Sequence, residues 1–304
     1  MRIAITGATG LLGSALLRRF RARGHTLTPI SRKIADPAGI RWDPERGALD
    51  AERLEGYDVV VNLSGARIAP ARWTRQYKEL LRTSRIQTTR LLCETLARLE
   101  HKPRVLLSAS AVGYYGNRPS EETVDEASPA GDTFLARLCV EWEAATEAAQ
   151  RAGIRTVLLR TGTVFSLQGG FLPPLLRVFR LGLGGRLGDG RQGLSWITLA
   201  DWVGAVEFLV ERDELSGPFN LTAPHPVSNA EFTRTLARIL RRPAFLTVPA
   251  PVLRWVFGAE MAEEVFLGGQ RAVPKRLLEA GFGFKQPDLE GALRAVLSGS
   301  VDAA

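Results

Sequence analysis

Short apolar runs alternate with longer amphipathic stretches over the first half of the chain. Five of these runs are predicted to be strands buried on both faces, because few polar residues interrupt them. They cover residues 2–6, 26–30, 58–63, 104–108 and 155–159. Helical periodicity follows most of them, over residues 12–24, 73–99 and 133–152. This alternation predicts an α/β fold with a doubly wound parallel sheet.

The pattern changes after Phe165, where glycine- and proline-rich connections become frequent. Two further helices are expected over residues 199–211 and 228–240, with a strand near 219–221 between them. The tail from 249 to 297 is expected to be mostly helical with loops. A chain of 304 residues with this pattern fits one large α/β domain, or one domain with a smaller lobe, better than two independent units.

Three glycines at three-residue spacing follow the first predicted strand. Gly7 permits a tight turn, Gly10 lets the backbone come close to a pyrophosphate, and Gly13 lets the next helix pack against the strand. Backbone N–H groups and the helix dipole would then face the phosphates. Because a strand precedes the turn and a helix follows it, the motif predicts a Rossmann-type dinucleotide-binding fold. The alternative, a glycine-rich turn without a ligand, is much less frequent in that context.

The end of the second strand indicates which dinucleotide binds. In such folds an acidic residue there binds the ribose 2′-hydroxyl of NAD, whereas arginine accommodates the 2′-phosphate of NADP. The chain has Ser31, Arg32 and Lys33 at this point, and no carboxylate before Asp36. We therefore expect NADP(H) rather than NAD(H), because a hydroxyl and a guanidinium bind a phosphate and an aspartate repels it. The alternative is that Arg32 and Lys33 are an ordinary basic pair on the protein surface, without a role in binding.

A second turn of small residues follows the strand at 58–63. Leu63, Ser64 and Gly65 are expected to lie under the adenine and the nicotinamide-side ribose. Arg85, on the following helix, is placed to reach back to a phosphate, and an ordinary surface arginine is an equal alternative.

The composition excludes several functions. No apolar run approaches the ~20 residues of a membrane span, and the arginines behind the net charge of +8 are dispersed, so we expect neither a membrane nor a nucleic-acid partner. An excess of basic over acidic residues favours the binding of a small polyanionic ligand. Cys93 and Cys139 do not make a disulfide framework, which favours a cytoplasmic protein. His25, His101 and His225 lie far apart, so no metal site is expected.

Four motifs together resemble those of the extended short-chain dehydrogenase/reductase superfamily. They are Thr-Gly-x-x-Gly-x-x-Gly at 6–13, Asn-Leu-Ser-Gly-Ala at 62–66, Ser-Ala-Ser-Ala-Val-Gly-Tyr-Tyr-Gly at 108–116 and Arg-Thr-Gly-Thr-Val at 160–164. Further features resemble its atypical epimerase-family branch, often labelled nucleoside-diphosphate-sugar epimerase. They include Ser31-Arg32-Lys33, Trp73 with Ser84-Arg85, Trp142-Glu143, residues 180–185, Ser195-Trp196-Ile197 and residues 270–282.

The resemblance runs nearly end to end and implies how the chain is divided. An NADP-binding Rossmann core would cover residues 1–165 and take in about 196–222, and a small, mostly helical C-terminal substrate lobe would cover 166–195 and 223–304. NADP(H) is the implied ligand, and the branch has no well-established substrate. At the motif positions the resemblance adds cofactor contacts, namely Thr9, Leu11, Leu12, Ser108 and Arg160. A homodimer is also compatible with the resemblance.

The usual catalytic pair of the superfamily, Tyr-x-x-x-Lys, is absent from this sequence. The tyrosines are Tyr57, Tyr77, Tyr114 and Tyr115, and the residues four positions on are Val61, Leu81, Arg118 and Pro119. No lysine occurs between Lys102 and Lys275. By resemblance, either Phe134 with Leu138 or Leu135 with Cys139 stands in the place of the pair. The usual proton relay is therefore missing.

Three candidate catalytic residues remain after the strand predicted at 104–108. Ser110 stands where the family serine does and can hydrogen-bond a substrate oxygen, or it satisfies the backbone at the strand end. Tyr114 and Tyr115 follow and are placed to bring a phenol near the nicotinamide, although aromatic packing is expected of at least one of them.

Residues 188–201 resemble the segment of sugar-nucleotide enzymes that binds a substrate diphosphate, but the diphosphate-binding arginine falls on Leu194. Arg191 or Arg186 would have to bind the diphosphate instead, from a different position and distance. We therefore expect a more apolar pocket with Trp196 and Phe171 as walls, and Asp201 as a helix cap.

These observations favour an NADP(H)-dependent oxidoreductase that acts on a small, largely apolar carbonyl compound, with proton delivery from water. A second hypothesis is a non-catalytic NADP(H) sensor or partner-binding protein, since the Tyr/Lys pair is lost. A third, a sugar-nucleotide epimerase, is disfavoured by Leu194.

Overall fold

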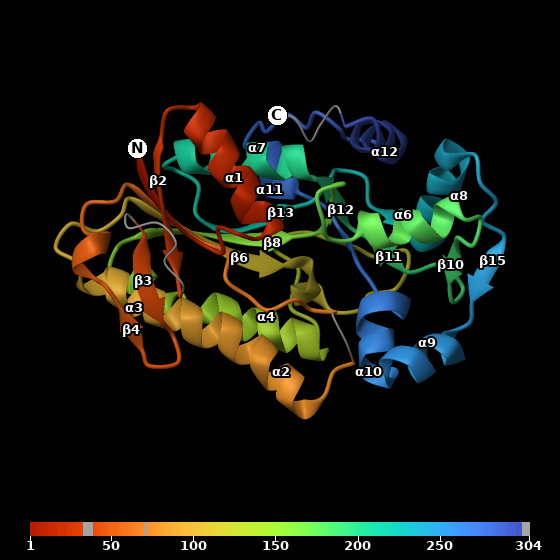
Figure 1. The fold of residues 1–304 in the computed structure, drawn as a ribbon, viewed down its shortest axis with the longest axis horizontal. Coiled ribbons are helices and arrows are strands. Elements are labelled where there is room, and N and C mark those ends of the chain that lie inside the picture. Colours follow the sequence, from red (N-terminus) through yellow and green to blue (C-terminus); the bar gives the residue numbers. More distant parts are fainter. Residues whose placement is uncertain (33–38, 70–71, 300–304) are drawn as a thin grey trace.

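The computed structural model describes residues 1–32, 39–69 and 72–299, and its centre is an eight-stranded sheet (Figure 1). The strand order is β13-β8-β6-β5-β1-β2-β3-β4. The strands are β1 (Arg2–Thr6), β2 (Thr26–Ser31), β3 (Ile40–Asp43), β4 (Ala48–Leu49), β5 (Val59–Asn62), β6 (Val105–Ala111), β8 (Arg155–Thr161) and β13 (Gly217–Leu221). Among the strand pairs that the described residues form in this sheet, only β3–β4 is antiparallel, so the predicted doubly wound parallel sheet is confirmed.

Helices cover both faces of the sheet (Figure 1). On one face lie α1 (Leu11–Ala22), α7 (Leu199–Glu211) and α11 (Lys275–Glu279). On the other lie α2 (Arg75–Arg82), α3 (Thr88–Arg98), α4 (Phe134–Ala144) and α5 (Glu147–Arg151). Successive strand residues point to opposite faces, so Ile3 and Ile5 join the core under α1 and α7, and Ala4 joins the core under α3.

Two of the expected helices are interrupted. The helix expected over residues 73–99 contains a π-helical turn, η2 (Thr83–Gln87), between α2 and α3. The helix expected over residues 133–152 divides into α4 and α5. The π-turn changes which side chains face the sheet and buries Arg85.

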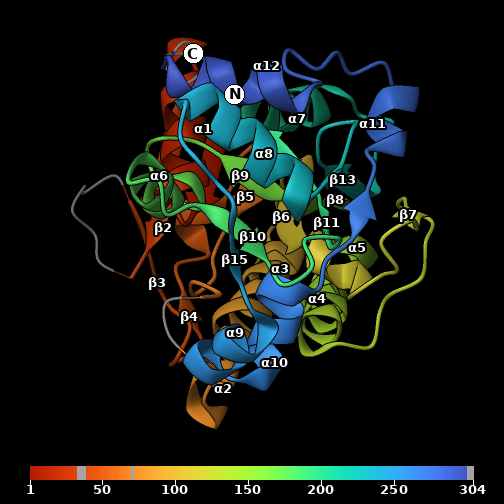
Figure 2. The same ribbon diagram turned by 90° about the vertical axis from the view of Figure 1, so that its right-hand side faces the viewer.

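The C-terminal part adds short paired strands and helices beside the sheet (Figure 2). The helices are α6 (Leu172–Arg180), α8 (Asn229–Leu240), α9 (Ala250–Phe257), α10 (Ala259–Met261), η4 (Ala262–Leu267) and α12 (Leu289–Leu297). The strand pairs are β10 (Gly185–Leu187) with β15 (Leu246–Val248), β11 (Gly193–Leu194) with β14 (Val227–Ser228), β12 (Trp196–Thr198) with β9 (Thr163–Phe165), and β16 (Arg271–Ala272) with β7 (Thr123–Val124). Two 3₁₀ turns, η1 (Glu52–Leu54) and η3 (Val112–Tyr115), complete the fold.

The structure contains a helix that the sequence pattern did not predict. Helix α6 begins in a stretch that holds Pro173 and Pro174, which suggested a connection. Both prolines stand in its first turn, where the missing N–H and the fixed φ angle do not disturb a helix. In the part of the chain that the structure describes, no helix combines the length and hydropathy of a bilayer span. The division into a core and a substrate lobe stays a prediction.

Candidate functional site

The glycine turn after β1 has the geometry that a phosphate cradle needs. Gly7 has a φ of +67°, and a Cβ atom there would lie 2.7 Å from the carbonyl oxygen of Leu63. A Cβ atom on Gly13 would overlap the carbonyl oxygen of Gly7. The first turn of α1 therefore packs directly on the backbone of the preceding turn, as the spacing predicts.

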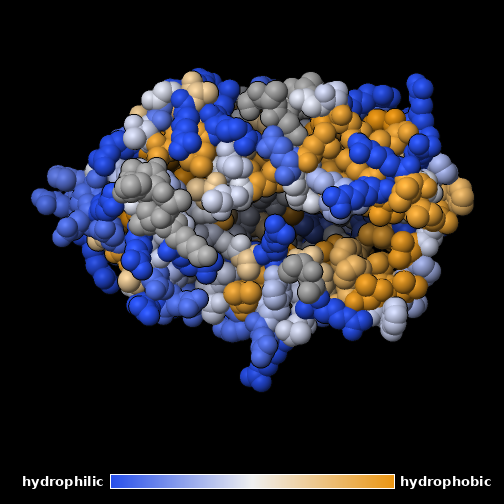
Figure 3. Space-filling model, in the orientation of Figure 1, coloured by the Kyte–Doolittle hydropathy of each residue, from blue (hydrophilic) through white to orange (hydrophobic). Residues whose placement is uncertain are grey.

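The N-terminus of α1 is open to a ligand. Gly10 is its N-cap and supplies no side-chain cap, and no acidic residue stands in the first turn. Thr9 and Gly10 are exposed, and Leu11 and Leu12 are half-buried. Figure 3 shows a hollow near the middle of the face on which α1 begins in Figure 1. The first-turn N–H groups, which have no helical partner, can thus meet a phosphate from solvent.

The structure places the end of β2 beside this turn. Thr6 is in register with Ile30, so the next residue, Ser31, lies alongside the glycine turn. Ser31 is half-buried and Arg32 is exposed, whereas Lys33 lies outside the described residues. An exposed guanidinium at this strand end can reach a phosphate group on a bound ribose.

The turn at 62–66 is held from below by a polar network. The Thr6 hydroxyl donates to Asn62 Oδ1 (2.9 Å) and accepts the N–H of Leu63 (2.9 Å). Asn62 Nδ2 donates to Thr89 Oγ1 (2.8 Å) and to Ser108 Oγ (3.3 Å). Ser108 is fully buried, so its hydroxyl supports the strand ends and does not face the hollow. Leu63 and Ser64 are half-buried and Gly65 is exposed, as a ligand-facing turn requires.

Arg85 corresponds to neither of the two roles expected for it. It is buried, and its guanidinium donates to the carbonyl oxygens of Ala66 (2.8 Å) and Leu81 (3.2 Å). It lies against Gly65 and 5.1 Å from the ring centroid of Trp142. Burial lowers the pKa of this guanidinium. Arg85 therefore supports the 62–66 turn from behind instead of standing free at a phosphate or on the surface.

A buried ion pair stands at the carboxyl ends of β6 and β8. Arg160 donates through Nε and Nη2 to the two carboxylate oxygens of Glu143, each at 2.8 Å. The Ser110 hydroxyl donates to Glu143 Oε1 at 2.6 Å. All three side chains are largely buried. Arg160 is thus engaged inside the protein, and its expected cofactor contact is replaced by a role in holding Glu143.

No role is predicted for Glu143 from the sequence, although the pair Trp142-Glu143 is part of the resemblance. A glutamate on an amphipathic helix is usually solvated, and nothing local shows that α4 turns it toward Ser110. The buried Arg160 at the end of a strand was the available signal, because a buried guanidinium needs a carboxylate partner.

The two tyrosines differ in environment. Tyr115 is fully buried, and its hydroxyl donates to Asn220 Oδ1 (2.7 Å) and accepts from Arg160 Nη1 (3.1 Å). Burial raises the pKa of Tyr115 to about 12. Tyr114 is half-buried, packs edge-on against Tyr115, and has the Arg160 guanidinium 3.5 Å from its ring centroid. Packing therefore explains Tyr115, and Tyr114 is the phenol nearer to solvent.

Helix α4 decides between the two candidate replacements for the Tyr/Lys pair. A Cβ atom on Gly113 would lie 3.6 Å from Leu135 Cβ and 3.9 Å from Cys139 Sγ, whereas Phe134 packs on Trp73 with ring centroids 5.2 Å apart. Leu135 and Cys139 thus face the segment that carries Ser110. Burial raises the pKa of Cys139 to about 12, so its thiol is not a ready proton donor.

The C-terminal segment that carries Glu260 and Glu264 packs against the start of α4. The carboxylate of Glu264 accepts the N–H groups of Phe134 (2.9 Å) and Leu135 (2.8 Å). Lys78 of α2 pairs with Glu260 at 2.7 Å. A carboxylate at a helix N-terminus satisfies unpaired N–H groups and favours the helix dipole. The lobe is thereby anchored on the helix that would carry the missing catalytic pair.

The residues expected to line a substrate pocket take other positions. Trp196 is fully buried and stacks on Phe165 with centroids 5.2 Å apart, so it belongs to the core and does not border an open pocket. Phe171 is 38% exposed. Leu194 pairs with Val227 between β11 and β14. An aliphatic side chain in this strand pair provides no diphosphate site.

Asp201 is not the helix cap that we expected. Thr198 caps α7, because its Oγ1 accepts the N–H of Asp201. The Asp201 carboxylate accepts the N–H groups of Lys285 (2.8 Å) and Gln286 (3.0 Å). It therefore fastens the C-terminal segment to the first turn of α7.

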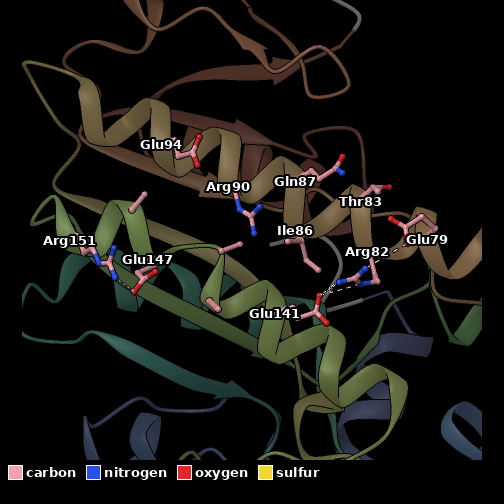
Figure 4. A pocket seen from close by; sticks show the side chains of 13 residues that line it. Glu79, Arg82, Thr83, Ile86, Gln87, Arg90, Glu94, Glu141, Glu147 and Arg151 are labelled. Carbon is pink, nitrogen blue, oxygen red and sulfur yellow. Dashed lines mark hydrogen bonds and ion pairs between the residues drawn. The ribbon is translucent and has the colours of Figure 1, made fainter.

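A second concavity of about 580 Å³ lies elsewhere, between α2–α3 and α4–α5 (Figure 4). Its lining includes Arg82, which pairs with Glu141, and Arg151, which pairs with Glu147. None of the residues of the glycine turn borders it. We place the candidate site at the glycine turn and the Ser110 segment, where open backbone donors and buried polar groups lie at the carboxyl ends of β1 and β6, with the end of β5 between them.

Comparisons with known proteins find similar proteins along nearly the whole chain. Residues 3–222 match the model of the NAD dependent epimerase/dehydratase family, and residues 248–296 match a domain of unknown function, DUF1731. An epimerase family protein of Mycobacterium tuberculosis is 47% identical over 292 residues, covering 96% of both chains. The human epimerase family protein SDR39U1 is 36% identical over 301 residues, covering 98% of this chain and all of the relative.

Two solved structures share the fold along nearly the whole chain. Human SDR39U1 (isoform 2), crystallised with NADPH, gives a TM-score of 0.91 at 35% identity and covers 98% of this chain and 99% of its own. A nucleoside-diphosphate sugar epimerase from Corynebacterium glutamicum gives 0.81 at 35% identity and covers 97% of this chain and 57% of its own. The epimerase-family resemblance seen in the sequence is confirmed.

Proposed function

The chain belongs to the NAD dependent epimerase/dehydratase family, and from that premise we propose that it is an NADP(H)-dependent oxidoreductase for a small, largely apolar carbonyl compound. The observation that carries the proposal is the uncapped N-terminus of α1 behind the glycine turn, with the exposed Arg32 beside it. A human relative of 35% identity that was crystallised with NADPH supports the same choice of cofactor.

The residues at the turn fit a phosphorylated dinucleotide. Backbone N–H groups of residues 9–13 would hold the pyrophosphate, and Ser31 and Arg32, with Lys33 from the sequence, would hold the 2′-phosphate. Residues 63–65 would lie under the adenosine and the second ribose. When bound, a nicotinamide supplies or accepts a hydride, and the protein contributes position and the exclusion of water.

Ser110 would position the substrate oxygen. Its proton is directed at Glu143, so in this arrangement the hydroxyl oxygen offers lone pairs to a ligand. To donate to a carbonyl oxygen, the hydroxyl has to rotate away from Glu143. The Arg160 ion pair keeps the carboxylate in place meanwhile. Tyr114 is the second polar group on the same segment, and water would deliver the proton.

A specific observation favours the second candidate, a non-catalytic NADP(H) sensor. Leu135 and Cys139 face the Ser110 segment where the family has its Tyr/Lys pair, and neither side chain replaces that proton relay. The third candidate, a sugar-nucleotide epimerase, is disfavoured because Leu194 stands where a diphosphate requires a cation. A homodimer and a cytoplasmic location stay predictions.

The experiment mixes the purified chain with NADPH and a panel of carbonyl compounds and follows the absorbance of the reduced nicotinamide. Ser110→Ala is compared with Ser216→Ala, an exposed serine just before β13, at the amino ends of the strands and not at the carboxyl ends where Ser110 lies. Consumption of NADPH that only Ser110→Ala abolishes supports the oxidoreductase. Tight NADPH binding without turnover, and with a change of oligomeric state, supports the sensor. Absence of NADPH binding refutes both.

A further inference from the structure

One edge of the C-terminal part exposes bulky apolar side chains. Among the described residues, the large apolar side chains that are more than half exposed are Leu181 (75%), Leu183 (58%), Phe245 (81%) and Trp255 (77%). We call these four residues the apolar edge. Single exposed apolar residues are ordinary, but a concentration of the most exposed ones on one part of a protein indicates an interaction surface.

The segments that carry the apolar edge lie side by side. β10 and β15 pair in parallel, with Gly185 opposite Leu246. A Cβ atom on Gly182 would lie 3.3 Å from Pro243 Cγ, so the turn after α6 lies against the chain that leads into β15. Helix α9 follows β15 directly and carries Trp255. Figures 1 and 2 show α6, β10, β15 and α9 together at one end of the molecule, where Figure 3 shows hydrophobic surface.

All charged residues of these segments are arginines. Residues 169–188 and 232–259 contain no aspartate or glutamate. Their arginines are Arg177, Arg180, Arg186, Arg234, Arg238, Arg241, Arg242 and Arg254. Two of them have carboxylate partners from outside these segments, Arg238 with Glu290 and Arg254 with Glu263. Arg177, Arg180, Arg241 and Arg242 are exposed and form no ion pair within the described part of the chain. The surface is therefore complementary to a partner that is both apolar and anionic.

A second copy of the chain does not meet that requirement. An isologous contact across the apolar edge would bring the exposed, unpaired arginines of two copies together, and residues 169–188 and 232–259 contribute no carboxylate to offset them. Bulky apolar side chains on a turn, an edge strand and a helix, accompanied by arginines, are typical of surfaces that enter the interface of a bilayer. There, arginine stems cover apolar surface while the guanidinium binds lipid phosphate.

We propose that the apolar edge docks this protein on an anionic phospholipid bilayer. Leu181, Leu183, Phe245 and Trp255 enter the boundary between headgroups and acyl chains, and the exposed arginines bind the headgroup phosphates. The expectation of no membrane partner rested on the absence of a spanning run, which says nothing about a docking surface. The glycine turn lies outside these segments, so the proposal is independent of the cofactor and the reaction.

The test uses the full chain and vesicles in co-sedimentation. Vesicles of phosphatidylcholine alone are compared with vesicles that contain phosphatidylglycerol as about a third of the lipid, at low and high salt. We expect binding only to the anionic vesicles, release by salt, and a blue shift of tryptophan fluorescence that Trp255→Phe removes. The double variant Phe245→Ser/Trp255→Ser should lower partitioning by about tenfold or more, because two bulky anchors are lost.

Leu278→Ser is the matched control, because Leu278 is an exposed leucine on α11, outside the apolar edge. The unfolding midpoint of each variant shows that it is folded. Failure of the wild type to bind anionic vesicles would overturn the proposal. Equal binding by the wild type and the double variant would also overturn it. The same holds if the wild type is a dimer and the double variant is a monomer, since the apolar edge would then contact a second copy of the chain.

Discussion

Replacing Arg32 with alanine tests the choice of cofactor directly. Arg32 is exposed at the end of β2, beside the glycine turn. A hydrogen bond to a charged group contributes about 1.5–3 kcal/mol, and solvent screening at an exposed site brings this to about 1–2 kcal/mol. Arg32→Ala should therefore weaken NADPH binding by about 5- to 30-fold. NADH has no 2′-phosphate, so its affinity should stay within about twofold.

Calorimetric titration of each variant with both nucleotides measures the two dissociation constants. Arg21→Ala is the control, because Arg21 is an exposed arginine in the last turn of α1. About ten residues of helix separate it from Leu11, or about 15 Å, which exceeds the screening length at physiological salt. Equal weakening of NADPH and NADH by Arg32→Ala would refute the assigned role, as would an unchanged NADPH affinity.

Three further outcomes follow from the buried groups. Glu143→Ala should destabilise the fold by about 3–5 kcal/mol in denaturant unfolding, because it leaves the Arg160 charge buried and unpaired; a similar loss in Glu143→Ala/Arg160→Met would contradict this. Tyr115→Phe should lower the free energy of unfolding by about 1–3 kcal/mol, since Asn220 and Arg160 lose their hydrogen-bond partner. The variant should also lose the tyrosine titration near pH 12 in ultraviolet absorbance, and an unchanged titration would speak against the assignment to Tyr115. Glu126, which follows β7, is buried, and its carboxylate accepts the N–H groups of Asn220 (2.9 Å) and Arg276 (3.3 Å). Burial raises the pKa of Glu126 above 4.5, so its stabilising contribution is complete below that pH and is lost as pH rises through the folded-state pKa. Glu126→Gln should therefore lose less stability than wild type on going from acidic to neutral pH, and an identical pH dependence would argue against a raised pKa.

Local chemistry was enough to predict the sheet and the tight glycine turn after β1. Buried parallel strands are recognisable because most of their residues are apolar, and the glycines at 7 and 13 are required by contacts within a few residues or with the turn after the neighbouring strand. The start of α6 was not predictable in the same way, since Pro173 and Pro174 are as compatible with a first helical turn as with a loop.

Side-chain roles at the site were less predictable than the backbone. Arg160 resembled a cofactor contact and is the partner of Glu143, seventeen positions earlier in the chain. The two meet because β8 pairs beside β6 and α4 crosses the end of that pair. Arg85 was placed on a regular helix, and the π-turn at Thr83–Gln87 directs it behind the 62–66 turn instead.

The sequence by itself therefore determined the parallel sheet, the glycine cradle, the arginine beside it and the loss of the Tyr/Lys pair. These depend on periodicity, on backbone conformation and on which residue types occur at all. The tertiary structure alone decided that Ser110 faces Glu143, that Leu135 and Cys139 face the Ser110 segment, and that the apolar edge is assembled from separate segments. Each of these depends on strand register and helix crossing, which bring together residues that no local pattern connects.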